Sequence, residues 1–355
     1  MVRSRLRIKG VVVDTQVVSE RAGRLGLVPL SASGRPVFAA LDLGTNNCRL
    51  LIARAQSGGF RVIDAFSRIV RLGEGLSRSD RLSERAVERT LAALRVCGTK
   101  IQRRGVTALR AVATEACRRA INCDDFLEQA IRETGIALEI ISSTEEGRLA
   151  LAGCSPLLDA EVPYALVFDI GGGSTEIMWL ELMGWGRPPR LIDQISLRHG
   201  VVSLAEQYGS DEIDDRSYSL MVETVAASVE PFERRNNIRA AVALGKVQLL
   251  GTSGTVTTLA GVNLGLARYE RSIIDGSHLS VAHARLVTLH LKEMDYHQRA
   301  AHPCIGYDRA DLVMAGCAVL EAICDIWPFE RLRIADRGLR EGILADFIDS
   351  LKSTA

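Results

Sequence analysis

Several kinds of feature are missing from this 355-residue sequence, and each absence narrows the class of protein. None of the eight cysteines forms a C-x-x-C pair, so buried reduced thiols and a reducing compartment are expected. No uncharged apolar run approaches the roughly 18 residues that a membrane-spanning helix needs. The net charge is only +1, which argues against a general nucleic-acid or membrane surface. These absences favour a cytoplasmic enzyme without a membrane or nucleic-acid partner.

Sequence length and hydrophobic content indicate two domains. A chain of 355 residues, 47% of them hydrophobic, can bury two cores. Residues 1–35 differ from the rest, because three arginines and a lysine precede a short apolar run and glycine, serine and proline follow it. This segment lacks the long apolar core and small-residue cleavage site of a secretory signal, so a disordered basic tail is expected.

From residue 36 on, the pattern predicts a three-strand meander followed by alternating helices and strands, and this order occurs twice. Strands are expected at 37–41, 48–53, 60–65, 106–113, 137–141, 164–168, 175–180, 191–197, 247–250 and 332–335. Helices are expected at 83–101, 124–134, 144–154, 211–235, 256–262, 281–294, 308–327 and 340–351. The prediction is an α/β architecture with mixed sheets, divided into domains at 36–160 and 161–339. The closing segment 340–355 is expected to pack back on the first domain.

Residues 169–176, which read Asp-Ile-Gly-Gly-Gly-Ser-Thr-Glu between two apolar strands, are the most informative segment. Three consecutive glycines allow a sharp turn with positive φ, and the N–H groups they leave bare make a phosphate cradle. An acid before the turn and another after it would repel a bare polyanion. The same acids suit a divalent cation placed between protein and phosphate. The segment therefore indicates metal-assisted phosphate chemistry.

The same kind of turn occurs elsewhere in the chain. Residues 42–46 read Asp-Leu-Gly-Thr-Asn between two apolar strands, and the turn at 251–255 opens a helical stretch. Any single glycine turn is more often an ordinary hairpin. Two at equivalent places in two halves, with a third that opens a helix, indicate a duplicated half that faces itself across a cleft.

Together with residues 143–148 and 336–342, these turns resemble the exopolyphosphatase / guanosine pentaphosphate phosphatase (Ppx/GppA) family in its short two-domain form. Order and spacing match from about Val37 to the end, although the glycine turns alone are shared with sugar kinases, actin and Hsp70. The resemblance implies the actin-like ATPase (ASKHA) fold, with two ribonuclease-H-like domains around an interdomain cleft. It also implies Mg²⁺-dependent release of a terminal phosphate from inorganic polyphosphate or pppGpp. Members of the family often pair into a homodimer, and for this chain the oligomeric state stays open.

The resemblance assigns roles to individual residues. Glu146, the second acid of Glu-Glu-Gly-Arg, would activate water, and a carboxylate among phosphates and other acids is expected to have a raised pKa. From the residues alone, Glu145 and Glu146 are acids in the first turn of a helix that Thr144 caps. Phosphate binding is expected at Gly44, Thr45, Asn46, Arg118, Gly171, Gly172, Gly173, Ser174, Gly254 and Thr255, and Mg²⁺ binding at Asp42, Asp169 and Glu176.

Other residues are expected to have structural roles. Arg148 should tie its helix to a neighbouring carboxylate, Asn122 should cap the following helix, and Gly338 should form a tight strand-to-helix turn. His283, His290 and His297 recur every seven residues, but no HExxH pattern accompanies them, so a polar helix stripe is expected.

Two other functions remain open at this point. The first is an ATP-dependent small-molecule kinase on the same fold, and the second is a non-catalytic alarmone or polyphosphate sensor. The Glu146 motif argues against both. The chain stops soon after residue 342, whereas long family members continue, and it has no His-Asp dipeptide. A second metal-dependent activity is therefore not expected, and processive action on long polyphosphate is in doubt.

Overall fold

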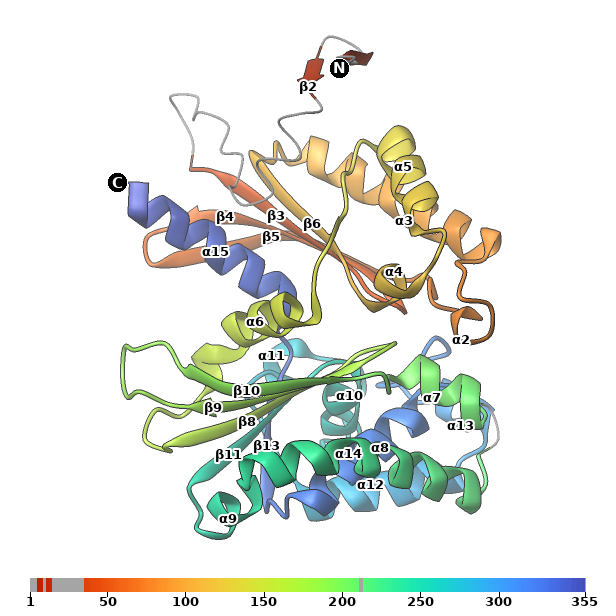
Figure 1. Ribbon diagram of the computed structural model, residues 1–355, viewed down its shortest axis with the longest axis vertical. Helices are drawn as coiled ribbons and strands as arrows, with labels where there is room; N and C mark the ends of the chain where they lie inside the picture. The colour runs from red at the N-terminus through yellow and green to blue at the C-terminus, as the bar shows by residue number, and fades with distance from the viewer. Residues whose placement is uncertain (1–4, 9–10, 15–34, 211–212, 355) are drawn as a thin grey trace.

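The structure, a computed structural model, describes residues 5–8, 11–14, 35–210 and 213–354 (Figure 1). Within the basic N-terminal segment, β1 (Arg5–Ile8) pairs with β2 (Val11–Asp14) as an antiparallel ribbon. The rest of the predicted tail lies outside the described residues. No helix in the described part of the chain has both the length and the apolar character to cross a bilayer.

The first sheet has five strands in the order β5-β4-β3-β6-β7. Its strands are β3 (Val37–Leu43), β4 (Asn47–Gln56), β5 (Gly59–Ile69), β6 (Ala108–Ala113) and β7 (Glu139–Ile140). The first three form the predicted antiparallel meander, and β6 lies parallel to β3. Strand β7 is shorter than the predicted strand at 137–141, and both of its residues are exposed rather than buried.

Helices cover both faces of this sheet because the apolar strand β3 presents hydrophobic side chains to each face in turn. Leu41 packs with residues of α3 (Glu84–Arg103) and α5 (Cys123–Thr134) on one face. On the other face Phe38 stacks on Phe347 of α15 (Leu339–Thr354), with ring centroids 4.8 Å apart. Helix α15 also packs against α6 (Ser143–Cys154), so the C-terminal helix lies against the first sheet (Figure 1).

The second sheet repeats this plan with six strands in the order β10-β9-β8-β11-β13-β12. Its strands are β8 (Tyr164–Ile170), β9 (Thr175–Glu181), β10 (Arg190–Leu197), β11 (Val247–Thr252), β12 (His278–Ser280) and β13 (Arg331–Ala335). An antiparallel meander is again followed by parallel strands, β11 beside β8 and β13 beside β11. The duplication predicted from the turns is therefore present in the sheet order.

The remaining helices mostly cover the second sheet. They are α7 (Val201–Tyr208), α8 (Asp215–Asn236), α9 (Ile238–Ala243), α10 (Gly254–Asn263), α11 (Arg271–Ile274), α12 (Val281–Glu293), α13 (Tyr296–Ala301) and α14 (Val313–Ile326). The first half adds α2 (Leu76–Ser79) and α4 (Glu115–Arg119), and a 3₁₀ turn, Ser155–Leu157, leads to the second half.

Several boundaries predicted from the sequence were wrong. The sequence analysis missed helix α7, and the helix predicted from residue 308 begins at Val313. His297 lies on α13, not on the helix of His283 and His290, so the three do not form one stripe. Asn122 does not cap α5, because its side-chain amide exchanges two hydrogen bonds with the backbone of Leu82.

Candidate active site

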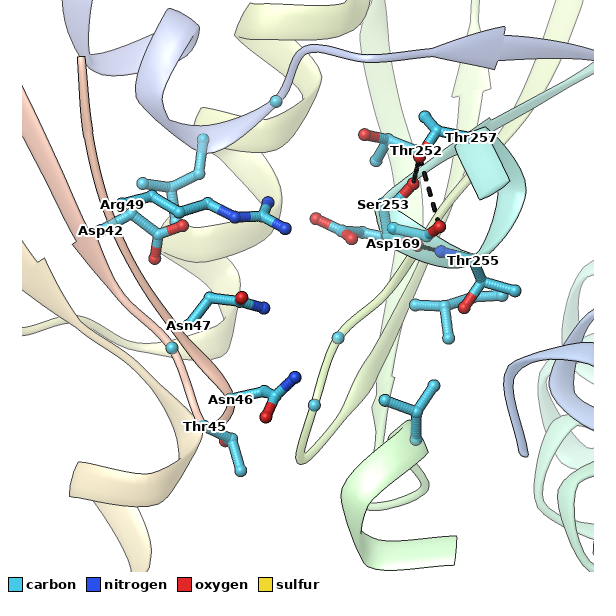
Figure 2. Close-up of a pocket in the computed structure, with 18 of the residues that line it drawn as sticks. Asp42, Thr45, Asn46, Asn47, Arg49, Asp169, Thr252, Ser253, Thr255 and Thr257 are labelled. Atoms are coloured by element: carbon cyan, nitrogen blue, oxygen red, sulfur yellow. Dashed lines mark hydrogen bonds between the residues drawn. The ribbon is translucent and has the colours of Figure 1, made fainter. Parts of the chain in front are cut away.

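A cavity of about 370 Å³ lies between the two halves, and both glycine-containing hairpins open into it (Figure 2). Strands β3 and β4 contribute the loop Gly44–Asn46, and β8 and β9 contribute the loop at 171–174. The start of α10 forms a third wall. The predicted site residues that line the cavity are Asp42, Gly44, Thr45, Asn46, Glu146, Asp169, Gly171, Gly172, Gly173, Ser174, Gly254 and Thr255. Arg118 and Glu176 lie behind this lining.

The glycines of the second loop are required for a different reason from the one predicted. None of Gly171, Gly172 and Gly173 has a positive φ, so left-handed backbone does not explain them. A Cβ atom on Gly172 would instead lie 3.1 Å from the backbone nitrogen of Asn46. A Cβ atom on Gly173 would lie 2.6 Å from the side-chain oxygen of Thr45. The two loops thus approach each other closely, and this contact favours glycine in the second loop. At the third turn it is Ser253 that has a positive φ, of 103°.

Buried acidic side chains with raised pKa values determine the electrostatic character of the cavity. Burial, and then the nearby carboxylate of Glu176, raise the pKa of Asp169 to about 7. Burial also raises the pKa of Asp42, although Arg49 opposes this shift. Glu176 accepts hydrogen bonds from the hydroxyls of Ser174 and Ser196, each 2.8 Å long, and burial raises its pKa despite them. An acid in a low-dielectric site binds its proton more tightly unless a cation is nearby.

Glu146 reaches the cavity from the first turn of α6, and Ser142 rather than Thr144 caps this helix. Burial and then Glu176 raise the pKa of Glu146 well above its usual range. One carboxylate oxygen accepts a 2.8 Å hydrogen bond from Nη1 of Arg118. Arg118 also pairs with Glu115 and donates to the carbonyl of Ile141. In this arrangement Arg118 holds the Glu146 carboxylate and is not among the residues that line the cavity.

The neighbouring acid Glu145 points elsewhere. It pairs with Arg148, and Arg148 also pairs with Asp346 of α15. The prediction that Arg148 ties its helix to a nearby carboxylate is therefore confirmed.

Five arginines to which the sequence analysis gave no binding role also line the cavity: Arg49, Arg271, Arg309, Arg337 and Arg340. Arg271 pairs with Glu341 at 2.7 Å, and Arg337 pairs with Asp275. Among the described residues, no carboxylate lies within 4.0 Å of the guanidinium nitrogens of Arg49, Arg309 or Arg340. Burial is the main cause that lowers the pKa values of Arg309 and Arg340. Figure 2 shows the guanidinium of Arg49 directed from the first hairpin toward Asp169 on the second. Partly buried cations without a carboxylate partner favour an anionic ligand.

Comparison with known proteins agrees with this geometry. The model of the Ppx/GppA phosphatase family matches residues 51–351, which is most of the chain. The chain belongs to the Ppx/GppA phosphatase family. A solved Ppx/GppA structure from Aquifex aeolicus is 28% identical and superposes with a TM-score of 0.68, covering 90% of this chain and 99% of that one. The chain thus has the mixed α/β, actin-like ATPase fold of Ppx/GppA proteins.

Two curated relatives have different names. A putative exopolyphosphatase of Haemophilus influenzae is 29% identical, and the match covers 86% of this chain and 90% of that protein. A guanosine-5'-triphosphate,3'-diphosphate pyrophosphatase of Aeromonas salmonicida is 30% identical over 87% of this chain. This chain spans only 59% of the Aeromonas protein's length.

The Mg²⁺ implied by Ppx/GppA membership fits the acids in part. Asp42 and Asp169 line the same cavity from opposite hairpins, and both are buried acids with raised pKa values. A cation between them would compensate both charges, and Mg²⁺ typically binds through one or two carboxylates while it keeps several waters. No cluster of three His, Cys, Asp or Glu side chains able to hold a metal occurs within the described ranges. Glu176 is turned toward Ser174 and Ser196, so two direct carboxylates fit better than three.

Proposed function

We propose that this chain hydrolyses the terminal phosphoanhydride of inorganic polyphosphate or of pppGpp, with Mg²⁺ bound and with Glu146 activating water. The supporting observation is that one cavity combines the buried carboxylate of Glu146, two backbone loops and three arginines without carboxylate partners. The curated relatives are named for these two substrates, which end in the same kind of anhydride.

The roles of the residues follow from the charge that phosphoryl transfer must neutralise. The transition state spreads negative charge over three oxygens, so the protein mainly positions and stabilises. The amides of the two loops hold the terminal phosphate, and the guanidinium groups of Arg49, Arg309 and Arg340 hold the phosphates that follow it. Bound Mg²⁺ supplies further positive charge at the carboxylates of Asp42 and Asp169.

Glu146 is suited to act on the attacking water. Its pKa is raised, which makes it a stronger base than an exposed carboxylate at neutral pH. Arg118 binds Oε2, so the carboxylate is oriented while Oε1 has no partner among the described residues. That oxygen can accept the proton of a water aligned with the terminal phosphorus.

Initial rates of phosphate release from polyphosphate, pppGpp and ATP plus a sugar, each with Mg²⁺, test the proposal. We expect release from at least one of the first two and no phosphorylated sugar. Glu146→Gln should lower kcat by about 10²- to 10⁴-fold, because general-base catalysis is lost. Glu145→Gln is the matched control, since Glu145 pairs with Arg110 and Arg148 away from the cavity, and it should keep near-parental activity.

Two outcomes would overturn the proposal in different ways. Unchanged phosphate release by Glu146→Gln removes Glu146 from the mechanism. Release from neither polyphosphate nor pppGpp removes the proposed activity itself.

A further inference from the structure

The loop at 171–174 is held from behind by the start of α7. The amide of Val201 donates to the carbonyl of Gly171 at 3.0 Å, and the amide of Val202 donates to the carbonyl of Gly172 at 2.8 Å. These are the first two amides of the helix, which have no acceptor within the helix itself. Both donate instead to carbonyl groups of the loop.

Fixing these carbonyls also fixes the amides that follow them. In a planar trans peptide, the carbonyl of one residue and the N–H of the next point in opposite directions. Because the carbonyls of Gly171 and Gly172 point back toward α7, the N–H groups of Gly172 and Gly173 point away from it. Both glycines line the cavity, and no described residue accepts a hydrogen bond from either amide.

The first loop is held in the same way. The amide of Gly73 donates to the carbonyl of Thr45 at 2.9 Å, and the amide of Val70 donates to the carbonyl of Asn46 at 2.8 Å. The N–H of Asn46 therefore points away from the segment at 70–73, and it too has no acceptor among the described residues. Each half of the molecule thus has its own backbone support behind its loop.

The positions of Gly200 and Gly73 require glycine because each lies very close to the loop that it supports. A Cβ atom on Gly200, the residue before α7, would overlap the carbonyl carbon and oxygen of Gly172. A Cβ atom on Gly73 would overlap the side chain of Thr45. Neither glycine has a positive φ, so contact with the loop, and not backbone conformation, is what excludes a side chain.

We propose that Gly200, Val201 and Val202, with Gly73 as their counterpart in the first half, are positioning residues that preorganise the loop amides for phosphate. Of the four only Val201 lines the cavity, and the role proposed for it belongs to its backbone N–H. The inference depends on the proposed function only in taking phosphate as the ligand of the loops.

The test compares affinities for tripolyphosphate with Mg²⁺, measured by isothermal titration calorimetry in a Glu146→Gln background, in which turnover is expected to be slow. Val201→Pro deletes the N–H that binds the carbonyl of Gly171. Proline is favoured at the first position of a helix, and Gly200 already has the extended backbone (φ −105°, ψ 173°) that a following proline needs. Val201→Ala loses the side chain but keeps the amide.

We expect Val201→Pro to bind tripolyphosphate roughly fivefold or more weakly than Val201→Ala, since one supporting hydrogen bond is lost. Gly200→Ala should bind at least about tenfold more weakly than the background, because the loop itself must move. Glu84→Pro is the matched control: Glu84 is the first residue of α3, far from the loops in sequence and exposed, and its affinity should equal that of the background. With Glu146 restored, Val201→Pro should raise KM without moving the pH dependence of kcat.

The outcomes separate this inference from the proposed function. Equal affinities of Val201→Pro and Val201→Ala, with thermal unfolding unchanged, would overturn the positioning role even if phosphate release is robust. A background protein that binds no tripolyphosphate would also overturn it, because the loops would then bind no phosphate. If the affinity contrast holds but no phosphate is released from polyphosphate or pppGpp, only the proposed reaction fails. Should Gly200→Ala not fold, the proline variant decides.

Discussion

The two hairpins that face each other across the cavity have the same strand-turn-strand arrangement but differ in charge. In the first hairpin Asp42 on β3 lies opposite Arg49 on β4, so the pair combines an acidic and a cationic side chain. In the second hairpin Asp169 on β8 lies opposite Glu176 on β9, so two acids face each other. The loops differ as well, because the first offers the side chains of Thr45 and Asn46 where the second offers glycine backbone. One opposing residue thus decides the electrostatic character of each half.

This difference appears in the acids themselves. Arg49 works against the rise in the pKa of Asp42, whereas Glu176 adds to the rise in the pKa of Asp169, which reaches about 7. A cation entering the cavity therefore gains more by binding the second hairpin than the first. The duplicated scaffold supplies similar loops, and glutamate in place of arginine at the opposing position makes the two halves electrostatically different.

The largest expected effect comes from removing the charge of Asp169. Asp169→Asn should lower kcat by about 10²- to 10³-fold, because a charge that would hold Mg²⁺ contributes several kcal/mol of transition-state stabilisation. Asp42→Asn should cost only about tenfold, since Arg49 already compensates part of the charge of Asp42. Steady-state rates over a Mg²⁺ titration measure both. Equal losses in the two variants would show that the hairpins share the metal evenly and would break the comparison.

A smaller effect is expected on the pH dependence of stability in metal-free protein. The pKa of Asp169 is about 7 in the fold and 3.8 in an unperturbed chain, so the folded state binds its proton more tightly. The stability from this group is fully present below about pH 4 and is lost as the pH rises to about 7. Glu176→Gln removes the neighbouring carboxylate and lowers the pKa of Asp169. Thermal unfolding at pH 5 and pH 8 in EDTA should therefore show a smaller loss of Tm in Glu176→Gln than in the parent.

The comparison between the hairpins would weaken if Glu176→Gln and the parent lost the same Tm between these pH values. The carboxylate opposite Asp169 would then contribute little to the charge of the second half. Adding Mg²⁺ at pH 8 gives an independent reading, because the parent should gain more stability from the ion than the variant.

The sequence alone predicted the two hairpins, because the residues that specify each hairpin lie close together in the chain. An apolar strand, an acid and a glycine turn lie within ten residues of each other, and the same pattern in both halves predicted the repeated sheet order. Glu146 was found through its motif, and its place in the cavity depends on one helix start. Local patterns were less reliable for ends of elements, where several residues can serve: Ser142 caps α6, although Thr144 is a chemically equivalent candidate two residues later.

The sequence could not show which residues that are far apart in the chain contact each other in the fold. Arg49 and Arg340 lie within or beside recognised motifs, but only the fold shows that they have no carboxylate partner in the part of the chain that the structure describes. Arg309 has no motif at all and reaches the cavity because the turn before α14 packs against α10, where it donates to the hydroxyl of Thr258. Likewise Gly200 reads as an ordinary loop glycine until its contact with Gly172 is visible.

The smallest expected effect separates two hydroxyls that bind the same oxygen of Glu176. Ser174 lies in the loop at 171–174 and Ser196 on β10, and both donate at 2.8 Å. Ser174→Ala and Ser196→Ala should each cost about 1–2 kcal/mol of unfolding free energy at pH 8, because a buried carboxylate loses one donor. Only Ser174→Ala should also raise KM, by a fewfold, since Ser174 lines the cavity and Ser196 does not. If both variants raise KM equally, the second hairpin acts on substrate through the charge of Glu176, and if neither does, the loop binds phosphate through its backbone alone.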